Sequence, residues 1–262
     1  MSLNKPKIFI ISWRGQHENA EFIANKLITF SPNVYIVYSD PDNSFSPSAP
    51  CHLIKRPNNL FWEDKFKNCL DLCNDQPMMV IHADCQCDNW ENLVKRYFSA
   101  REKIKNLGVW APYIRGTYYT LEKSEVFGYG NDGLRVAALT DGIVFALSTE
   151  LVKRMKLVKY GDNPIGWGID LLFCSAAYTF HQLIIIDNTV LVDHPKSRGY
   201  KTEEAVTGMN KFFSQFYIQE LIQCKLLRSY IESDYKSILL DVRPQSLEIF
   251  KKNGEDFYLH PR

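Results

Sequence analysis

The segment Met78–Trp90, MMVIHADCQCDNW, joins a short apolar run to a polar loop. The run Met78–Ile81 predicts a buried strand, and this strand ends in His82-Ala83-Asp84. The polar residues that follow predict a loop, and a helix is expected to open near Asp88. Open α/β sheets place their ligand chemistry at the carboxyl ends of the core strands. Asp84 therefore stands where a functional carboxylate is expected.

Two later segments are candidates for the same site as this strand end. One is Gly166–Asp170 (GWGID), and the other is Val192–Tyr200 (VDHPKSRGY), which follows a second apolar run. Both combine glycine with polar or charged side chains at the predicted boundary of an element. We expect the three segments to meet at one site that holds a metal ion and a diphosphate.

Composition points to an ordinary globular protein. A chain of 262 residues can form one large α/β domain or two small ones. Its hydrophobic content of 45% and charged content of 23% are typical of globular domains. Lys and Arg total 31 against 30 acidic residues, a formal net charge of +1. Because nucleic-acid binding normally needs a basic excess, we expect no nucleic-acid partner.

The cysteines and the N-terminus indicate the compartment. Seven cysteines are spread without a compact framework, and no secretory signal precedes them. Reduced thiols in a cytoplasmic protein are therefore expected. The apolar part of the opening MSLNKPKIFIISWRG is too short for a signal peptide or a membrane span. Membrane contact is expected to be peripheral at most, at the inner face of the cell membrane.

The cysteines also leave a zinc site as an alternative. Cys69 and Cys73 are one helical turn apart, and Cys85 and Cys87 lie just beyond the next strand. Four thiolates are a suitable zinc ligand set. Their spacing matches no known zinc ribbon or finger, and the first two fit the buried face of a helix.

Apolar patterning predicts alternating strands and helices. The expected strands are Lys7–Ser12, Val34–Tyr38, His52–Lys55, Met78–Ile81, Gly108–Ile114, Ile143–Leu147, Leu183–Asp187 and Thr189–Val192. The expected helices are His17–Phe30, Asn58–Cys73, Asn89–Lys105, Thr149–Leu157 capped by Ser148, Gly166–Phe180 and Glu203–Ile231. The segment Arg115–Gly133 is expected to hold two strands or a mobile flap. This order predicts an α/β fold with a mixed, mostly parallel sheet flanked by helices.

The expected organisation is a catalytic domain over residues 1–202 and a helical C-terminal extension over 203–262. The first strand–helix–strand unit would bring Arg14 and Asp40 to neighbouring carboxyl strand ends, where a nucleotide can lie. Both residues are equally well explained as surface loop residues. The aromatic helix near the C-terminus could dock on a membrane or a partner, but packing on the protein's own sheet is favoured.

The element order and the three segments resemble GT-A-fold glycosyltransferases, which move a sugar from a nucleotide diphosphate donor. The resemblance covers about Lys7 to Tyr200. In that fold the central strand ends in Asp-x-Asp, which holds Mn²⁺ or Mg²⁺ on the donor diphosphate. The resemblance implies that Asp84 is the metal ligand here, with His82 in place of the first Asp and contacting the donor. Asp88 is either a backup ligand or the N-cap of the next helix.

The other two segments resemble further parts of the same fold. Asp170 matches the catalytic base of inverting members, which takes the proton of the acceptor hydroxyl; a dipole-complementing helix residue is the alternative. The resemblance implies that Asp141 and Trp167 bind the acceptor. His194 matches a further metal ligand, and Arg198 and Tyr200 lie on a loop suited to the diphosphate.

The sequence therefore predicts a metal-assisted glycosyltransferase of the bacterial surface-polysaccharide type. Its expected partners are a nucleotide-sugar donor and a glycan or glycolipid acceptor, such as a lipopolysaccharide precursor. One alternative is a nucleotidyltransferase that forms a sugar nucleotide, although Ser12-Trp13-Arg14-Gly15 is a poor version of its phosphate loop. Another is a binding module without catalysis, in which His82 marks a decayed metal site. The oligomeric state is left open.

Overall fold

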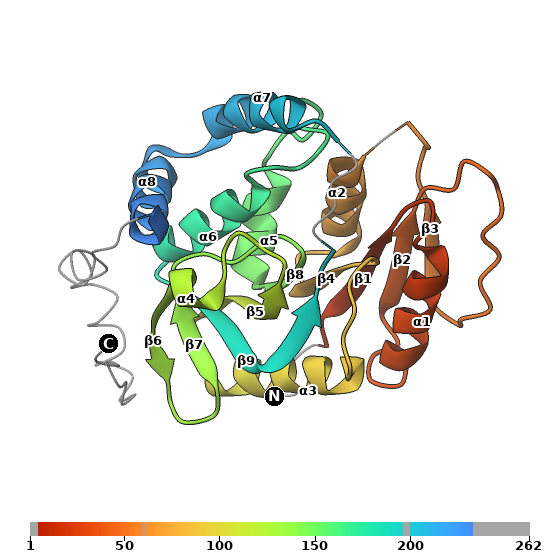
Figure 1. Ribbon diagram of the computed structural model, residues 1–262, viewed down its shortest axis with the longest axis horizontal. Coiled ribbons are helices and arrows are strands. Elements are labelled where there is room, and N and C mark those ends of the chain that lie inside the picture. The colour runs from red at the N-terminus through yellow and green to blue at the C-terminus, as the bar shows by residue number, and fades with distance from the viewer. Residues whose placement is uncertain (1–4, 60, 196–199, 233–262) are drawn as a thin grey trace.

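The computed structural model describes residues 5–59, 61–195 and 200–232, and it shows one mixed sheet between two layers of helices (Figure 1). Its strands are β1 (Lys7–Ser12), β2 (Val34–Tyr38), β3 (His52–Lys55), β4 (Met78–His82), β5 (Leu107–Arg115), β6 (Glu125–Tyr129), β7 (Leu134–Ala137), β8 (Val144–Leu147) and β9 (Leu183–Asp193). Its helices are α1 (His17–Leu27), α2 (Trp62–Leu72), α3 (Trp90–Lys103), α4 (Leu121–Ser124), α5 (Thr149–Lys156), α6 (Ile169–Thr179), α7 (Thr202–Phe212) and α8 (Ile218–Glu232), with a 3₁₀ turn at Phe213–Gln215.

The strand order is β3-β2-β1-β4-β8-β5-β9-β7-β6. The first four strands pair in parallel, as the β1–α1–β2 unit predicts, and β5 pairs in parallel with β9. Strand β8 runs antiparallel between β4 and β5, and β6, β7 and β9 form antiparallel pairs. The mixed α/β sheet is confirmed. Parallel pairs do not predominate among the described strands, however, because β8 runs in reverse direction at the centre and β7 runs antiparallel to both β6 and β9.

Both faces of the central strands are buried, which explains their continuous apolar sequences. In β1, Ile8 and Ile10 face the core layer covered by α1 and α3. Phe9 and Ile11 alternate with them and face the layer of α2, α5, α6 and α8. All four side chains are fully buried. A strand with helices on both sides carries its polar groups only at its ends, which is where the candidate site lies.

Two predicted boundaries differ from the structure, one in the sheet and one at the start of α3. The two expected strands at the end of the sheet form one strand, β9, with an irregular register after Asp187. Asp187 is fully buried and accepts hydrogen bonds from Arg96 and from the backbone of Thr189, so this bend is stabilised within a single strand. The N-cap of α3 is Asn89, which accepts from the Asn92 N–H, so the prediction for Asp88 as a cap is wrong.

The segment Arg115–Gly133, for which two strands or a mobile flap were predicted, forms the short helix α4 and one strand, β6, after the end of β5. Ser148 caps α5 as predicted, since its hydroxyl accepts from the Leu151 N–H. The long helical pattern after residue 203 forms α7 and α8 with the 3₁₀ turn between them. Residues 233–262 of the expected extension lie outside the described residues, and the boundary at residue 202 stays a prediction. In the described part of the chain, no helix is both long and apolar enough to cross a membrane.

Candidate metal and catalytic site

The ends of β4 and β9 bring the central residues together. His82 is the last residue of β4, Asp84 follows it, and His194 follows β9. The backbones of Gln86 and Asp193 form a bridge, with N–O distances of 2.9 and 2.8 Å in the two directions. This bridge holds the loop after β4 against the end of β9. As a result, residues more than a hundred positions apart in the sequence face one another.

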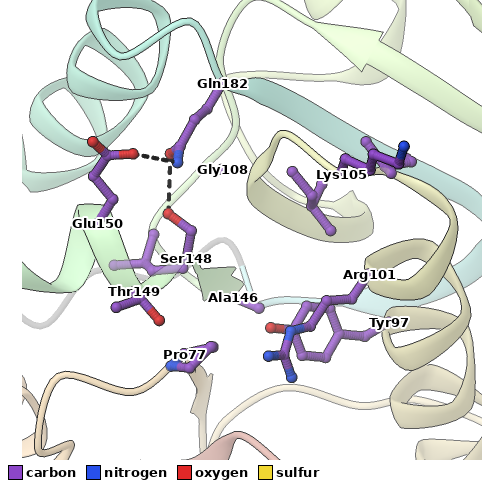
Figure 2. Close-up of a pocket in the computed structure, with 13 residues that line it drawn as sticks. Pro77, Tyr97, Arg101, Lys105, Gly108, Ala146, Ser148, Thr149, Glu150 and Gln182 are labelled. Atoms are coloured by element: carbon purple, nitrogen blue, oxygen red, sulfur yellow. Dashed lines mark hydrogen bonds between the residues drawn. The ribbon is translucent and has the colours of Figure 1, made fainter. Parts of the chain in front are cut away.

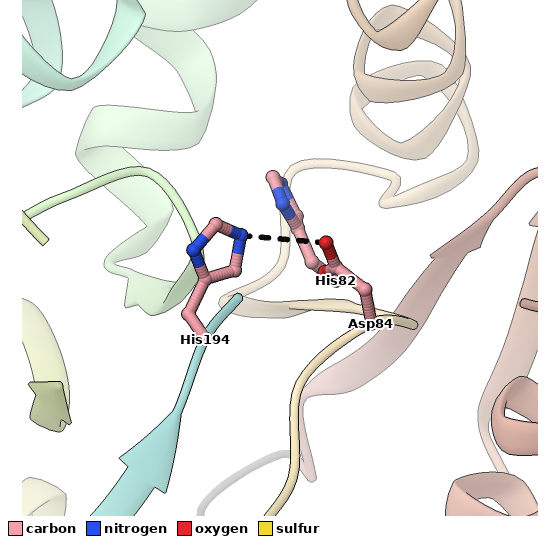
Figure 3. A group of neighbouring side chains, drawn as sticks. All are labelled: His82, Asp84 and His194. Carbon is pink, nitrogen blue, oxygen red and sulfur yellow. Dashed lines mark ion pairs between the residues drawn. The ribbon is translucent and has the colours of Figure 1, made fainter. Parts of the chain in front are cut away.

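The site is a group of three potential ligands, His82, Asp84 and His194 (Figure 3). One ligand atom from each lies within 4.8 Å of the others, and His194 Nε2 is 3.4 Å from Asp84 Oδ2. The other carboxylate oxygen of Asp84 is buried and has no hydrogen-bond partner among the described residues. A buried, unpaired carboxylate oxygen beside imidazoles fits a divalent cation.

Electrostatics favour an ionised Asp84 next to a neutral His82. Burial lowers the pKa of His82 to about 4, so this ring is neutral near pH 7. Burial by itself raises the pKa of Asp84. The hydrogen bond from His194 and the nearby imidazoles outweigh it and hold the pKa of that carboxyl below its usual range. A carboxylate that stays ionised is what a cation site needs.

His82 has a partner that the sequence did not indicate. The indole N–H of Trp62, on α2, donates a hydrogen bond to His82 Nε2, and Trp13 meets the same ring edge-on at 6.0 Å. The apolar stripe of the expected helix explained Trp62 as a core residue, so no sequence signal distinguished it. The structure places this ring between the core and the site.

A second group, the acid pair Asp141 and Asp170, lies at the same edge of the sheet. Because β8 is antiparallel to β4, its entry loop lies beside the end of β4, and the His82 N–H donates to the Ile143 carbonyl at 3.1 Å. Asp141 lies in this loop. A Cβ atom placed on the adjacent Gly142 would be 3.7 Å from the Asp170 Cβ, which shows how closely α6 approaches the loop.

Asp170 is in the first turn of α6, where its carboxylate accepts from the Leu171 N–H at 2.8 Å. Burial, together with the negative charge of Asp141, raises the pKa of Asp170 to about 7. The Thr117 hydroxyl donates to Asp141, another contact that the sequence did not indicate. A carboxyl poised near neutral pH is suited to proton transfer.

The remaining predicted site residues have other contacts. Trp167 donates from its indole N–H to the Tyr200 hydroxyl at 2.8 Å, which joins the loop before α6 to the segment after β9. Arg198 lies outside the described residues. Arg14 pairs with Asp42 at 2.9 Å on the surface. Asp40 is buried, and its carboxylate accepts from the backbone N–H groups of Ser44 and Phe45, so it organises its own loop.

The cysteine alternative finds no support in the geometry. Among the described residues, which include all seven cysteines, no group of three or more potential ligands contains a cysteine. Burial raises the pKa of Cys69 and of Cys85, and this disfavours the thiolate form that zinc requires.

A separate hollow of about 300 Å³ lies at the opposite edge of the sheet (Figure 2). It is lined by residues near the amino ends of β4, β5 and β9, by the carboxyl end of β8, by the start of α5 and by α3. Three of its polar side chains pair with one another, since Ser148 donates to Gln182 at 3.0 Å and Gln182 donates to Glu150 at 2.8 Å. None of the acids and histidines described above lines this hollow, so it is separate from them.

No protein-family model matches the chain, and no curated protein sequence matches it significantly. Among solved structures, it is similar to GalNAc-T7 crystallised with UDP, GalNAc and Mn²⁺, with a TM-score of 0.59 and 9% identity. The fold is GT-A-like. The match covers 80% of this chain and 48% of GalNAc-T7, so the chain spans about half the length of that structure. At this identity the likeness establishes the fold alone.

Two further structures are weaker matches. A putative glucose-1-phosphate thymidylyltransferase from Bacillus anthracis, in complex with sucrose, has a TM-score of 0.49 and 10% identity over 83% of this chain and 99% of its own. A UDP-glucose pyrophosphorylase complexed with UDP-glucose has a TM-score of 0.47 and 11% identity over 80% of this chain and 100% of its own.

Proposed function

We propose that the chain is a glycosyltransferase that moves a sugar from a nucleoside diphosphate donor to a hydroxyl acceptor with the help of a divalent cation. One observation carries the proposal. The group of His82, Asp84 and His194 and the acid pair Asp141 and Asp170 lie at one edge of the sheet, joined through the backbone of His82 and Ile143. This reaction needs both a site for an anionic leaving group and a base for the acceptor.

At the first group, Asp84 and His194 would hold Mn²⁺ or Mg²⁺. A bound cation supplies charge neutralisation for the departing nucleoside diphosphate. His194 also keeps Asp84 oriented through their contact at 3.4 Å. Arg14, Asp40, His82, Arg198 and Tyr200 are proposed to lie along the nucleotide and its phosphates.

At the acid pair, Asp170 takes the proton of the acceptor hydroxyl as that oxygen attacks the anomeric carbon. Its pKa of about 7 gives a useful fraction of ionised carboxylate near neutral pH together with adequate basicity. Asp141 and Trp167 would bind the acceptor, with Thr117 holding Asp141 in place. Direct attack with Asp170 as base inverts the anomeric centre. A glycan or glycolipid, such as a polysaccharide or lipopolysaccharide precursor, is the proposed acceptor.

The test is a thermal-shift panel of nucleoside diphosphates and nucleotide sugars, with and without Mn²⁺, followed by assays for sugar transfer. A ligand that binds only the folded state adds about 2.7 kcal/mol at a hundredfold excess over its Kd. We expect one nucleotide to raise Tm only with Mn²⁺, and Asp84→Ala to abolish that shift. Asp75→Ala is the matched control, because Asp75 lies at the amino end of β4, where it pairs with Lys156.

The other outcomes separate the alternatives. A chain that binds no nucleotide refutes the proposal. Formation of a sugar nucleotide from a sugar phosphate and a nucleoside triphosphate would identify a nucleotidyltransferase instead. Binding without metal-dependent donor hydrolysis or transfer would identify a binding module.

A further inference from the structure

The hydrogen bond between Trp62 and His82 determines which ring nitrogen of His82 carries its proton. An indole nitrogen can only donate, because its lone pair belongs to the aromatic ring. The Trp62 N–H points at His82 Nε2, so this nitrogen must accept and must be unprotonated. A neutral imidazole has one N–H group. The proton of His82 therefore lies on Nδ1.

This tautomer conflicts with a role for His82 as a metal ligand. A metal binds an imidazole through a nitrogen lone pair. In His82 the Nε2 lone pair accepts the Trp62 N–H, and Nδ1 carries a proton. Binding a cation through Nδ1 would move the proton to Nε2 and set two N–H groups against each other. His82 is close enough to Asp84 and His194 to share a cation with them, but its hydrogen bond to Trp62 gives it a different role.

Trp62 is itself held firmly. Its ring stacks on Phe66 with centroids 5.0 Å apart and an interplanar angle of 13°. On another side lies Gly166, where a Cβ atom would come within 2.5 Å of the Trp62 ring. Gly166 has a φ of +86°, a conformation suited to glycine, so the loop before α6 can approach the indole this closely. Packing between a core ring and this loop fixes the direction of the N–H group.

We propose that Trp62 is a positioning residue that keeps His82 in the Nδ1–H form, so that His82 donates a hydrogen bond to an oxygen of the bound nucleoside diphosphate and leaves the cation to Asp84 and His194. The inference rests on the proposed function for the identity of the ligand. The tautomer itself belongs to the protein without ligand. The orientation of an adjacent partner is a known means of selecting the tautomer of a functional histidine.

The first test is two-bond ¹H–¹⁵N NMR on the metal-free protein with ¹⁵N-labelled histidine, at mildly alkaline pH where histidines are neutral. The chain has 6 histidines, and His82→Asn identifies the signals of His82. We expect the Nδ1–H pattern in the wild type and a mixture of both tautomers in Trp62→Phe, which keeps a stacked ring but lacks the N–H. An Nε2–H pattern in the wild type, or an unchanged pattern in Trp62→Phe, would overturn the proposal.

The second test measures Mn²⁺ affinity by titration with electron paramagnetic resonance. We expect Asp84→Asn and His194→Asn to weaken binding by about tenfold or more, and His82→Asn to stay within about twofold of the wild type. His52→Asn is the control, because His52 lies on the edge strand β3, stacked on Tyr35. A loss in His82→Asn as large as that in Asp84→Asn would refute the division of roles.

The two measurements also separate this inference from the proposed function. If no Mn²⁺ binds to the wild type, the proposed metal site fails while the NMR result still decides the tautomer. If the tautomer is as expected, the donor role is checked by nucleotide affinity. His82→Asn should then weaken binding of the nucleotide found in the thermal-shift panel more than His52→Asn does, and an equal affinity for the two variants would refute it.

Discussion

Arg154 and Glu220 join helices α5 and α8 through two parallel hydrogen bonds of 2.7 Å each. Both side chains are buried, and Glu220 is completely so. The arginine also donates to the Gln215 carbonyl, and its guanidinium lies 4.1 Å from the centroid of the Tyr217 ring. The ion pair therefore connects α8 to the helix layer that contains α5 and α6. Asp170 lies on α6.

Glu220→Gln is expected to destabilise the protein by about 3–5 kcal/mol, because it leaves the buried Arg154 guanidinium without its counter-charge. Chemical denaturation of the variant and wild type checks this. Asp71→Asn is the control, since Asp71 pairs with Lys67 on the surface and its loss should cost at most about 1 kcal/mol. Equal stability of Glu220→Gln and the wild type would show that the ion pair contributes nothing.

The rate of sugar transfer is expected to rise with pH through an apparent pKa near 7, since Asp170 acts only when ionised. Asp170→Asn should lower the rate by about 10²–10⁴-fold. Asp141→Asn removes the charge that helps to raise the pKa of Asp170, so the acid limb of the profile should move to lower pH. The pH dependence of kcat for the three proteins is the measurement. A limb that does not move in Asp141→Asn would argue against this coupling.

The same carboxyl should affect stability. The pKa of Asp170 in the folded protein, about 7, is above its ordinary value of 3.8, so between these pH values the folded state holds more protons than the unfolded state. The stabilisation of the folded state by this group is therefore complete below about pH 4, and it decreases as the pH rises toward 7. Asp170→Asn should flatten this part of the stability profile, measured by denaturation at a series of pH values. An identical slope in the variant would contradict the shift.

Gly166→Ala is expected to lower the free energy of unfolding by about 2–4 kcal/mol, because it combines a positive φ with a clash against the Trp62 ring. Gly161→Ala is a matched control five residues earlier. A Cβ at Gly161 meets nothing within 4 Å, so its effect should stay within about 1 kcal/mol. Thermal and chemical denaturation compare the two variants. Similar stabilities would mean that the contact with Trp62 relaxes without cost.

Local patterning was sufficient for the elements whose sequence has one strong signal. The bounds of β1, β2 and β3 are as predicted. In β1 and β2 the reason is that short runs rich in β-branched and aromatic residues favour the strand. Longer irregular elements were less predictable. The bend of β9 depends on Arg96, which comes from α3, and this contact removes the boundary that the sequence suggested at Asp187.

In the candidate site, too, some residues could be recognised from the sequence and others could not. Asp84 and His194 were recognised because each lies within three residues of the end of an apolar run, and the structure brings them together. Their roles, and those of the other predicted site residues, stay predictions. Trp62 and Thr117 were missed because each contacts the site through a segment distant in the sequence. Nothing in their local sequence differs from that of an ordinary core tryptophan or loop threonine.

By itself the sequence determined that strands alternate with helices and that carboxylates and a histidine follow strand ends, since periodicity and turn residues act over a few positions. Only the tertiary structure decided that β8 runs antiparallel beside β4, and this places Asp141 next to the end of the central strand. It likewise decided that Trp62 meets His82 and that Asp170 approaches Asp141. The physical reason is that strand order and side-chain contacts are set by packing of the whole core, to which every distant segment contributes.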